Sequence, residues 1–414
     1  MSDDELWERI HQLLYDLTSN YSALVSFSEK WIEENNIHPL VMQNLNRIVS
    51  GAIDHLHYEA DFEVWRDDEE RKKEERNKQT EITYKAIEKA LKDPSLEELR
   101  LEKGSLEGLD FSPLKQLENL KHVEISSVTP LTGISDLLSN TPNIEKLNII
   151  DSGPFSIDSL KEIASLGSLR DLFIAYYSGF GETSLAPLGS CTTLKKLTLQ
   201  GLELTNIDLG FTVKLANLEK ICLDRNKLTG CDLGPLSQNK SLRELSIERN
   251  ELESLDLTPL SSCKNFNILS LSNNKLKEID LAPLAHCDMT ELDILGNQLQ
   301  RVDLTPLAEC PNLETVLLFR NRLEDIDLWP LSSCKKLTYL NLSKNLLRSI
   351  DLTPLFRCKA LRKLSIKENR LTTVDLSPLL ECKKLKELYL EGNKIKDLDT
   401  SPLKGLPQYI DIKW

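Results

Sequence analysis

Short stretches in which apolar and polar residues alternate recur along most of this chain. In the clearest of them, Leu245 and Ile247 alternate with Glu244, Ser246 and Glu248. A period of two is expected for a strand that buries one face, because successive side chains of a strand point to opposite sides. We therefore predict a short strand whose leucine side enters a core and whose other side stays free.

A turn and a brief helical segment follow this strand. Asn250 comes next, and its amide can bond backbone groups that a bending loop leaves unpaired, while stacked copies can satisfy one another. Thr258 and Pro259 are typical of an N-cap and a first helical position. The pattern predicts a strand on the inner wall and a short helix or 3₁₀ turn that returns along the outer wall.

This unit repeats with a step of 24 residues, and once of 23. A fixed period of this size marks a stack of equivalent units rather than one ordinary core. The asparagine recurs at Asn226, Asn250, Asn274, Asn297, Asn321, Asn345, Asn369 and Asn393. In phase with it, a proline within D-L-x-P-L or a close relative recurs at Pro235, Pro259, Pro283, Pro306, Pro330, Pro354, Pro378 and Pro402.

Upstream units keep the apolar positions but lose the asparagine. Their frames begin at Leu96, Leu120, Ile144, Leu169 and Leu194, and the asparagine position holds Gly104, Val128, Ser152, Tyr177 and Leu202. Counting frames as far as Tyr409 gives thirteen units and a terminal strand that ends at Trp414. We expect Tyr409, Ile412 and Trp414 to be buried in that strand, leaving an open edge that Trp414 blunts or a second subunit covers.

The frame L-x-x-L-x-L-x-x-N, together with this period, resembles the leucine-rich repeat superfamily. The resemblance implies an α/β fold, a leucine-rich repeat solenoid of about 13–14 repeats over residues 94–414. Such a solenoid has a curved parallel sheet on its concave side and short helical or 3₁₀ turns outside. The chain looks like the short-repeat class that includes phosphatase-1 regulators, but its period and its D-L-x-P-L signature depart from their repeat of about 22 residues. Phosphatase regulation is therefore not carried over.

Residues 1–93 do not follow the repeat and are predicted to form a helical hairpin. Two apolar stripes at helical spacing support two helices and include Trp7, Trp31 and Trp65. The hairpin either caps the open core of the first repeat, as solenoid ends require, or serves as a separate partner-binding or self-associating element. The charged run 66–78 is a solvated helix or a mobile linker, and residues 82–91 regain helical spacing.

Composition bears on partners and compartment. The net charge of −14 and the pI of about 5.1 argue against nucleic acid as a partner. No apolar stretch is long enough to cross a bilayer, and the first residues lack the basic start and apolar run of a signal peptide. We therefore expect a cytoplasmic protein without membrane insertion.

Two further ladders follow the repeat. Cysteines at one repeated position are predicted to be small buried residues under the outer wall, since C-x-x-C spacings suited to a metal site or disulfide are absent. They are Cys191, Cys263, Cys287, Cys310, Cys334, Cys358 and Cys382. A run of aspartates is predicted to open each outer-wall segment as a turn or cap, with a calcium-binding rail as the alternative. They are Asp208, Asp232, Asp256, Asp280, Asp303, Asp327, Asp351, Asp375 and Asp399.

Catalytic and cofactor motifs are absent from the chain. The six histidines form no H-E-x-x-H frame, and no glycine-rich phosphate loop occurs. His55 and His57 lie two residues apart on a predicted helix, so they point to different sides and make poor joint metal ligands. We expect no catalytic residue, no metal and no cofactor.

Apolar side chains at inner-wall positions that are usually polar mark a candidate partner site. Leu295, Leu317 and Phe319 alternate with buried leucines, and together with Tyr339 they form a predicted exposed patch. Such patches often mark interaction sites, and aromatic and arginine residues are favoured in binding hot spots. The rim of this patch is formed by Arg320 and Lys344.

A second inner-wall patch is predicted earlier in the chain, at Ile150, Phe173, Ala175 and Tyr176. The repeats are irregular there, and a slip of one residue would turn these side chains into the core.

These observations predict a non-enzymatic protein–protein interaction scaffold that binds a protein partner on the concave face of the repeat arc. The alternative is a regulatory or substrate-recognition subunit of a separate enzyme, such as a phosphatase, a ligase or a GTPase regulator. Homodimer formation through the C-terminal edge strand or the N-terminal hairpin stays open.

Overall fold

The computed structural model describes residues 78–406 and 411–414, apart from 129–130, 132, 154–156, 178–179 and 181–183. The chain divides into two units, Met1–Glu75 and Arg76–Trp414. The first unit lies outside the described residues, and with it the predicted hairpin and most of the charged run. The fold described below is that of the second unit.

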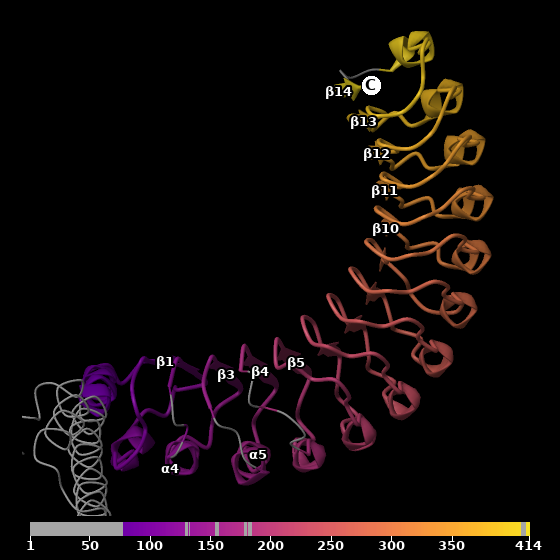
Figure 1. The fold of residues 1–414 in the computed structure, drawn as a ribbon. Helices are drawn as coiled ribbons and strands as arrows, with labels where there is room; N and C mark the ends of the chain where they lie inside the picture. The colour runs from indigo at the N-terminus through magenta and orange to yellow at the C-terminus, as the bar shows by residue number, and fades with distance from the viewer. Residues whose placement is uncertain are drawn as a thin grey trace, which may run out of the picture. The chain divides into compact units, whose positions relative to one another are not determined.

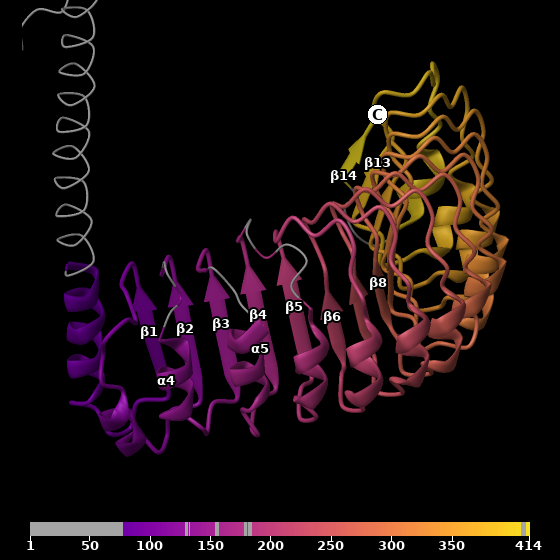
Figure 2. The ribbon, with the colours of Figure 1, turned by 60° about the horizontal axis from the view of Figure 1, so that its bottom comes forward.

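The described residues form one parallel sheet of fourteen strands that follow the order of the chain (Figures 1 and 2). Neighbouring strands pair in register, so that equivalent residues of successive repeats lie side by side, as Thr315 does beside Glu291 and Tyr339. The sheet is curved and does not close, which confirms the predicted α/β solenoid. The strands are β1 Glu98–Glu102, β2 His122–Ser126, β3 Lys146–Ile150, β4 Asp171–Ala175, β5 Lys196–Gln200, β6 Lys220–Cys222, β7 Glu244–Ser246, β8 Ile268–Ser270, β9 Glu291–Asp293, β10 Thr315–Leu317, β11 Tyr339–Asn341, β12 Lys363–Ser365, β13 Glu387–Tyr389 and β14 Asp411–Lys413.

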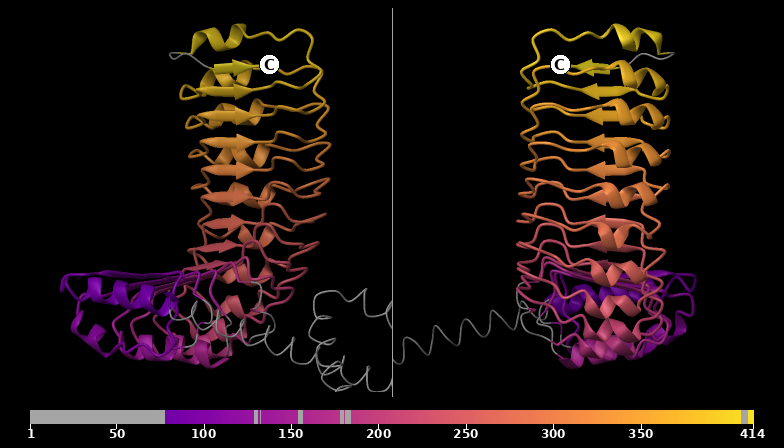
Figure 3. Two further views of the ribbon diagram at one scale, coloured as in Figure 1. Left: turned by 60° about the vertical axis from the view of Figure 1, so that its left-hand side comes forward. Right: turned by 90° about the vertical axis from the view of Figure 1, so that its right-hand side faces the viewer.

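Short helical segments return the chain along the opposite wall (Figure 3). Most are 3₁₀ helices, and they need more room along the stack than strands about 4.8 Å apart, which places the sheet on the concave side. The helices are η1 Ser112–Gln116, α4 Ile134–Ser139, α5 Ile157–Ala164, η2 Ala186–Ser190, η3 Gly210–Lys214, η4 Gly234–Gln238, η5 Thr258–Ser262, η6 Ala282–Leu284, η7 Thr305–Glu309, η8 Trp329–Ser333, η9 Thr353–Arg357, η10 Ser377–Glu381 and η11 Ser401–Gly405.

The start of η5 differs from the prediction. Its N-cap is Leu257 rather than Thr258, and no side chain at that position caps the helix. The cap comes instead from Asp256, whose Oδ1 accepts the backbone N–H of Thr258 at 2.8 Å. A carboxylate two residues before the first helical N–H reaches it better than a hydroxyl that is already inside the helix.

One continuous hydrophobic cluster fills the space between the two walls, from Ile87 to Leu406. Each strand contributes the apolar side chains of its leucine face, such as Val316 and Leu318, which are fully buried. Burial of apolar surface is the main favourable term in folding, so the units depend on their neighbours for a closed core.

The asparagines bind the stack together through the backbone. Asn321 donates from Nδ2 to the carbonyl oxygens of Ile294 at 3.0 Å and Leu318 at 3.2 Å, and its Oδ1 accepts the N–H of Leu299 at 3.1 Å. Two of these three partners belong to the preceding repeat. The amides therefore satisfy backbone groups across the repeat boundary, and this replaces the predicted pairing between stacked asparagines.

The first repeat of the stack is covered by a helix at the start of the described residues. Residues 78–90 are helical, and Ile87 and Ala90 belong to the core cluster. A Cβ added to Gly104 would overlap Oγ1 of Thr83. Gly104 occupies the asparagine position of the first repeat. Because glycine has no Cβ, the helix that carries Thr83 can lie close to the backbone there.

The last strand differs from the prediction. Ile412 is partly buried as expected, but Trp414 is 58% exposed and lies beyond β14. β14 is the edge strand of the described sheet, so no neighbouring strand covers Trp414 on that side. Tyr409 lies outside the described residues.

Candidate functional site

The inner face of the sheet carries the side chains that alternate with the buried leucines. The in-register pairing aligns them in columns, so that Leu317 lies between Asp293 and Asn341. Neighbouring residues of one column are therefore 23 to 25 positions apart in the chain. A surface spread over several repeats can be read directly from this register.

The apolar residues of the predicted patch lie on this inner face. Leu295, Leu317, Phe319 and Tyr339 are all partly exposed, and none belongs to the buried cluster. Leu295 and Phe319 are neighbours across the strands, because Gly296 N–H donates to the carbonyl oxygen of Phe319 at 2.8 Å.

The rim residues of the patch sit at a special backbone position. Arg320 and Lys344 are exposed and hold positive φ angles of 58° and 51°. Glycine occupies the same position at Gly296 and Gly392, with φ of 68° and 74°. This left-handed conformation turns the chain at the end of each strand and projects the side chain over the edge of the inner face.

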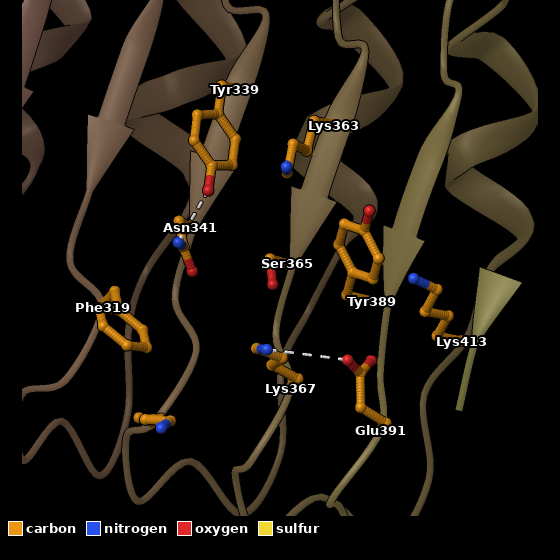
Figure 4. Close-up of a pocket in the computed structure, with 10 residues that line it drawn as sticks. Phe319, Tyr339, Asn341, Lys363, Ser365, Lys367, Tyr389, Glu391 and Lys413 are labelled. Atoms are coloured by element: carbon orange, nitrogen blue, oxygen red, sulfur yellow. Dashed lines mark hydrogen bonds and ion pairs between the residues drawn. The ribbon is translucent and has the colours of Figure 1, made fainter. Parts of the chain in front are cut away.

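A hollow of about 450 Å³ adjoins the patch (Figure 4). Its floor is formed by the short side chains of Asn341 and Ser365, on neighbouring strands. Rings and lysines surround this floor because the flanking positions carry long side chains. The hollow is lined by Phe319, Tyr339, Asn341, Lys344, Lys363, Ser365, Lys367, Tyr389, Glu391 and Lys413.

The lysines of the hollow lie over its aromatic rings. Lys363 Nζ is 5.2 Å from the ring centres of both Tyr339 and Tyr389, and Lys344 Nζ is 5.6 Å from that of Phe319. Cation–π attraction over such distances holds the ammonium groups at the surface of the hollow. The hydrogen bond from Lys363 to Glu387 raises the pKa of this lysine, so it carries its charge throughout the physiological range.

The inner face upstream of the patch is acidic. Asp293 is only 8% exposed, and burial raises its pKa to about 6, with Glu248 and Glu291 adding to the effect. Burial, followed by the charge of Asp224, also raises the pKa of Glu248. Both pKa values are raised because a carboxylate loses hydration beside other carboxylates.

The second predicted patch is also on the inner face. Phe173 pairs with Asn148 and Thr198 on that face, so no register slip turns it inward. Phe173 is partly exposed and Tyr176 is 48% exposed, whereas Ala175 is buried among its neighbours. The Tyr176 hydroxyl accepts a hydrogen bond from Gln200 Nε2. The accessible part of this patch is thus smaller than predicted.

The outer wall has exposed apolar residues that the sequence analysis did not single out. Trp329, Phe356 and Leu380 are each at least 36% exposed, in the successive helices η8, η9 and η10. A signal was present for Trp329, because it stands where equivalent helices have Thr305 and Thr353.

The aspartate ladder has a structural role. Oδ1 of Asp303 accepts the N–H of Thr305 at 2.8 Å, and the same bond recurs from Asp208 to Asp399. Hydrogen bonds from the hydroxyl and the backbone of Thr305 lower the pKa of Asp303. Each carboxylate is therefore used to open an outer-wall helix, as predicted.

The cysteines of the repeat are free, buried thiols. Sγ of Cys334, Cys358 and Cys382 each donates to a carbonyl of the preceding repeat at 3.3 Å. Burial raises the pKa of each of these thiols to about 12. The prediction of small buried residues is confirmed, with the addition of a hydrogen bond across the repeat boundary.

One group of possible metal ligands lies on the first two strands. An imidazole nitrogen of His122 and carboxylate oxygens of Glu98 and Glu124 lie within 4.8 Å of one another. Arg100 already pairs with Glu98 at 3.1 Å, and burial, followed by the charge of Lys146, lowers the pKa of His122. These two cations oppose the binding of a metal ion, and we assign no function to the group.

Among the described residues, no helix has the length and apolar character that a bilayer span needs.

Known proteins share the repeat and the fold. Family profiles match at residues 188–314, described as a BspA type leucine rich repeat region, at 311–371, a leucine rich repeat, and at 359–405, leucine rich repeats. Among curated proteins, no match was found.

Solved structures give the same result. A leucine-rich repeat protein of Leptospira interrogans is 27% identical, with a TM-score of 0.63, over 79% of this chain and 80% of that one. The internalin InlF of Listeria monocytogenes is 22% identical, with a TM-score of 0.62, over 80% of this chain and 93% of its own. The functional domain of InlJ from the same species, which includes a cysteine ladder, is 23% identical with a TM-score of 0.52, over 75% and 66%. With its 24-residue period and its parallel sheet in chain order, this chain belongs to the leucine-rich repeat superfamily.

Proposed function

We propose that this protein is a non-enzymatic interaction scaffold that holds a protein partner on the concave face of its sheet. Leucine-rich repeat folds are commonly protein-interaction modules, and solenoids ordinarily bind through their extended concave surface. The observation that carries the proposal is the position of Leu317 and Phe319, which project from the concave face of the sheet, away from the core, and remain partly exposed. Strands elsewhere in the stack mostly place polar residues there.

The contact is centred on strands β9 to β11. Apolar side chains form its middle and cations its rim, an arrangement that suits a hot spot surrounded by polar contacts. The residues are Leu295, Leu317, Phe319, Arg320, Tyr339 and Lys344. Phe173 and Tyr176, five to six repeats earlier, offer a second contact to a partner long enough to follow the sheet.

The test replaces Leu317 and Phe319 with Ser in the full chain. Because both side chains lie outside the core, we expect the free energy of unfolding to change by about 1 kcal/mol or less per site. Binding of a partner captured from the source cells should fall at least tenfold, roughly the loss of one hot-spot residue.

A matched control is Trp329→Thr, which removes an exposed aromatic side chain from the outer wall. Threonine is the residue at the equivalent position of the two neighbouring helices, at Thr305 and Thr353. The control should bind like the parent. Equal binding by all three proteins would refute the concave-face site, and unfolding of the Leu317/Phe319 variant would show that these residues belong to the core. The identity of the captured protein then decides whether the scaffold serves an enzyme as a regulatory or substrate-recognition subunit.

A further inference from the structure

The charges of the inner face are arranged in bands along the sheet. The inner face of β10 to β12 carries four cations and one carboxylate, namely Arg320, Lys344, Lys363, Lys367 and Glu368. The preceding strands β6 to β9 carry five carboxylates and three cations, namely Asp224, Glu244, Glu248, Glu291, Asp293, Lys220, Arg225 and Arg249. After the cationic band, β13 and β14 add Glu387, Glu391, Asp411 and Lys413. A cationic band therefore stands between two acidic ones, in a protein of net charge −14.

Two lysines of the hollow pair with carboxylates outside its lining and keep donors free on the cationic side. Lys344 pairs with Glu368 at 3.4 Å, and Lys363 pairs with Glu387 at 2.9 Å. In each pair the carboxylate belongs to the next strand towards the C-terminus. An ammonium group has three N–H donors, so donors remain on the side of Asn341, where the lining has no carboxylate.

An acceptor without a partner lies at the other end of the hollow. Oε2 of Glu391 is buried and has no hydrogen-bond partner among the described residues. Lys367 approaches the other oxygen of this carboxylate at 3.8 Å, beyond hydrogen-bond range. The Glu391 side chain as a whole is 37% exposed, so its carboxylate can accept an N–H donor from a ligand on the side of this second oxygen.

We propose that the face of β10 to β12, with its hollow, binds an acidic polypeptide segment, and this proposal rests on the proposed function. Carboxylates of the segment lie against Lys344 and Lys363, a backbone or side-chain N–H satisfies Glu391, and an apolar residue of the segment packs on Leu317 and Phe319. A polypeptide segment that carries carboxylates, N–H donors and an apolar side chain matches all three features.

The width of the band selects a short segment over a nucleic acid. Strands β10 and β12 are two strand spacings apart, or about 10 Å, which an extended chain crosses in roughly three residues. A longer polyanion that crosses the strands would run onto the carboxylates of β9 or β13. Beyond the band, the acidic strands favour basic residues in the part of the partner that follows.

The experiment selects peptides from a random display library on the full chain and then measures the enriched peptides in solution by fluorescence anisotropy. The test variant is the double substitution Arg320→Gly and Lys344→Gly. Both positions have positive φ, and glycine already occupies the equivalent position in other repeats, at Gly296 and Gly392. The charges are therefore removed without strain in the fold.

The matched control is Arg225→Gly with Arg249→Gly. These residues hold the same backbone position, with φ of 57° and 53°, on β6 and β7, and their replacement removes the same charge from outside the band. We expect enriched peptides to be rich in Asp and Glu, to bind at least tenfold more weakly to the test variant, and to bind the control within about twofold, with affinity that falls as salt rises.

The outcomes separate the two proposals. Enriched peptides that need Leu317 and Phe319 but are not acidic would overturn this inference and leave the proposed function standing. Peptides that bind the parent, the Leu317/Phe319 variant and both charge variants equally would overturn the concave-face function itself. If oligothymidylate binds the parent more tightly than the acidic peptides and loses affinity in the test variant, the band is a nucleic-acid site and the proposal is wrong.

Discussion

At the scale of single residues, thirteen positions share one backbone conformation that shapes the inner face. The residue that follows each strand face holds a positive φ, from Lys103 to Gly392, and only three of the thirteen are glycine. A non-glycine residue in this region is strained. The strain is tolerated because the next residue is anchored, in the regular repeats by the asparagine amide.

We predict that Asn321→Ala destabilises the fold by roughly 2–4 kcal/mol, since it leaves two carbonyl oxygens and one N–H unpaired in the interior. Urea unfolding followed by circular dichroism measures the effect. The control is Asn273→Gly, at a position with φ of 55°, which should change stability by no more than about 1 kcal/mol. Equal effects at the two sites would contradict the anchoring role.

Asp293 gives a prediction for pH. Its folded pKa of about 6 lies above the ordinary value of 3.8, so the folded state holds the proton more tightly than the unfolded state. Stability should therefore fall as pH rises from about 4 to about 6, and Asp293→Asn should remove this loss. We expect the variant to be more stable than the parent by on the order of 2 kcal/mol near pH 7 and equal to it below about pH 4.

Thermal unfolding at a series of pH values measures this difference. Asp303→Asn is the control with opposite sign, because its pKa is lowered by Thr305. That variant should be less stable than the parent at neutral pH, and the difference should vanish as pH falls through the folded pKa of Asp303. A parallel pH profile for Asp293→Asn and the parent would show that the carboxylate of Asp293 is hydrated.

At the scale of the element, several outer-wall helices end at a position that holds a small hydrogen-bond donor, whereas η1, η3 and η11 have leucine there, at Leu117, Leu215 and Leu406. Cys334 donates to Leu307 from this position, and Asn239, the equivalent residue of an earlier repeat, donates to Thr212 and Leu215. Both side chains reach a carbonyl that the preceding helix leaves free at its C-terminal end. The ladder is thus a series of cross-repeat hydrogen bonds at helix ends.

We predict that the ladder cysteines of the folded protein react very slowly with N-ethylmaleimide at about pH 7. The thiolate is the reactive species, and burial raises the pKa of Cys334, Cys358 and Cys382 to about 12. Mass spectrometry should find these thiols unmodified under native conditions and all nine cysteines of the chain modified in denaturant. Rapid native labelling of the ladder would mean that the outer wall opens.

At the scale of the whole stack, stability depends on how well the core of the first repeat is covered. Repeats contact only their neighbours, so an uncovered end exposes core and frays. The helical residues 78–90 provide this cover, and Gly104 makes their close approach possible.

We predict that Gly104→Ala displaces this helix, because the new methyl group would meet Thr83. Amide hydrogen exchange in residues 78–90 and β1 should accelerate, with a local loss of roughly 1–3 kcal/mol. Gly167→Ala is the control, since a Cβ there meets no atom within 4 Å. Unchanged exchange near β1 in Gly104→Ala would show that the helix does not close the stack.

Much of this fold follows from the one-dimensional pattern. The alternation around Leu245 and Ile247 and the 24-residue step together specify the strands, their parallel order and their register, because each unit makes its contacts with the same positions of the next unit. For the same reason the inner-face position of Leu317, Phe319 and Phe173 could be predicted. The residue whose side chain caps η5 could not be predicted, since Thr258 and Asp256 both have suitable side chains and only the path of the turn selects between them.

The candidate site depended more on three-dimensional packing. The hollow exists because Asn341 and Ser365 are short where Tyr339, Lys363 and Tyr389 are long, a comparison between side chains on three neighbouring strands. The exposure of Trp414, the burial of Ala175 and the proximity of His122 to Glu98 and Glu124 likewise depend on neighbours from other repeats. A repeating pattern specifies which face a side chain takes, because that is a property of the local backbone. The volume left over that face, and the charges that meet there, are set only when unlike repeats are stacked.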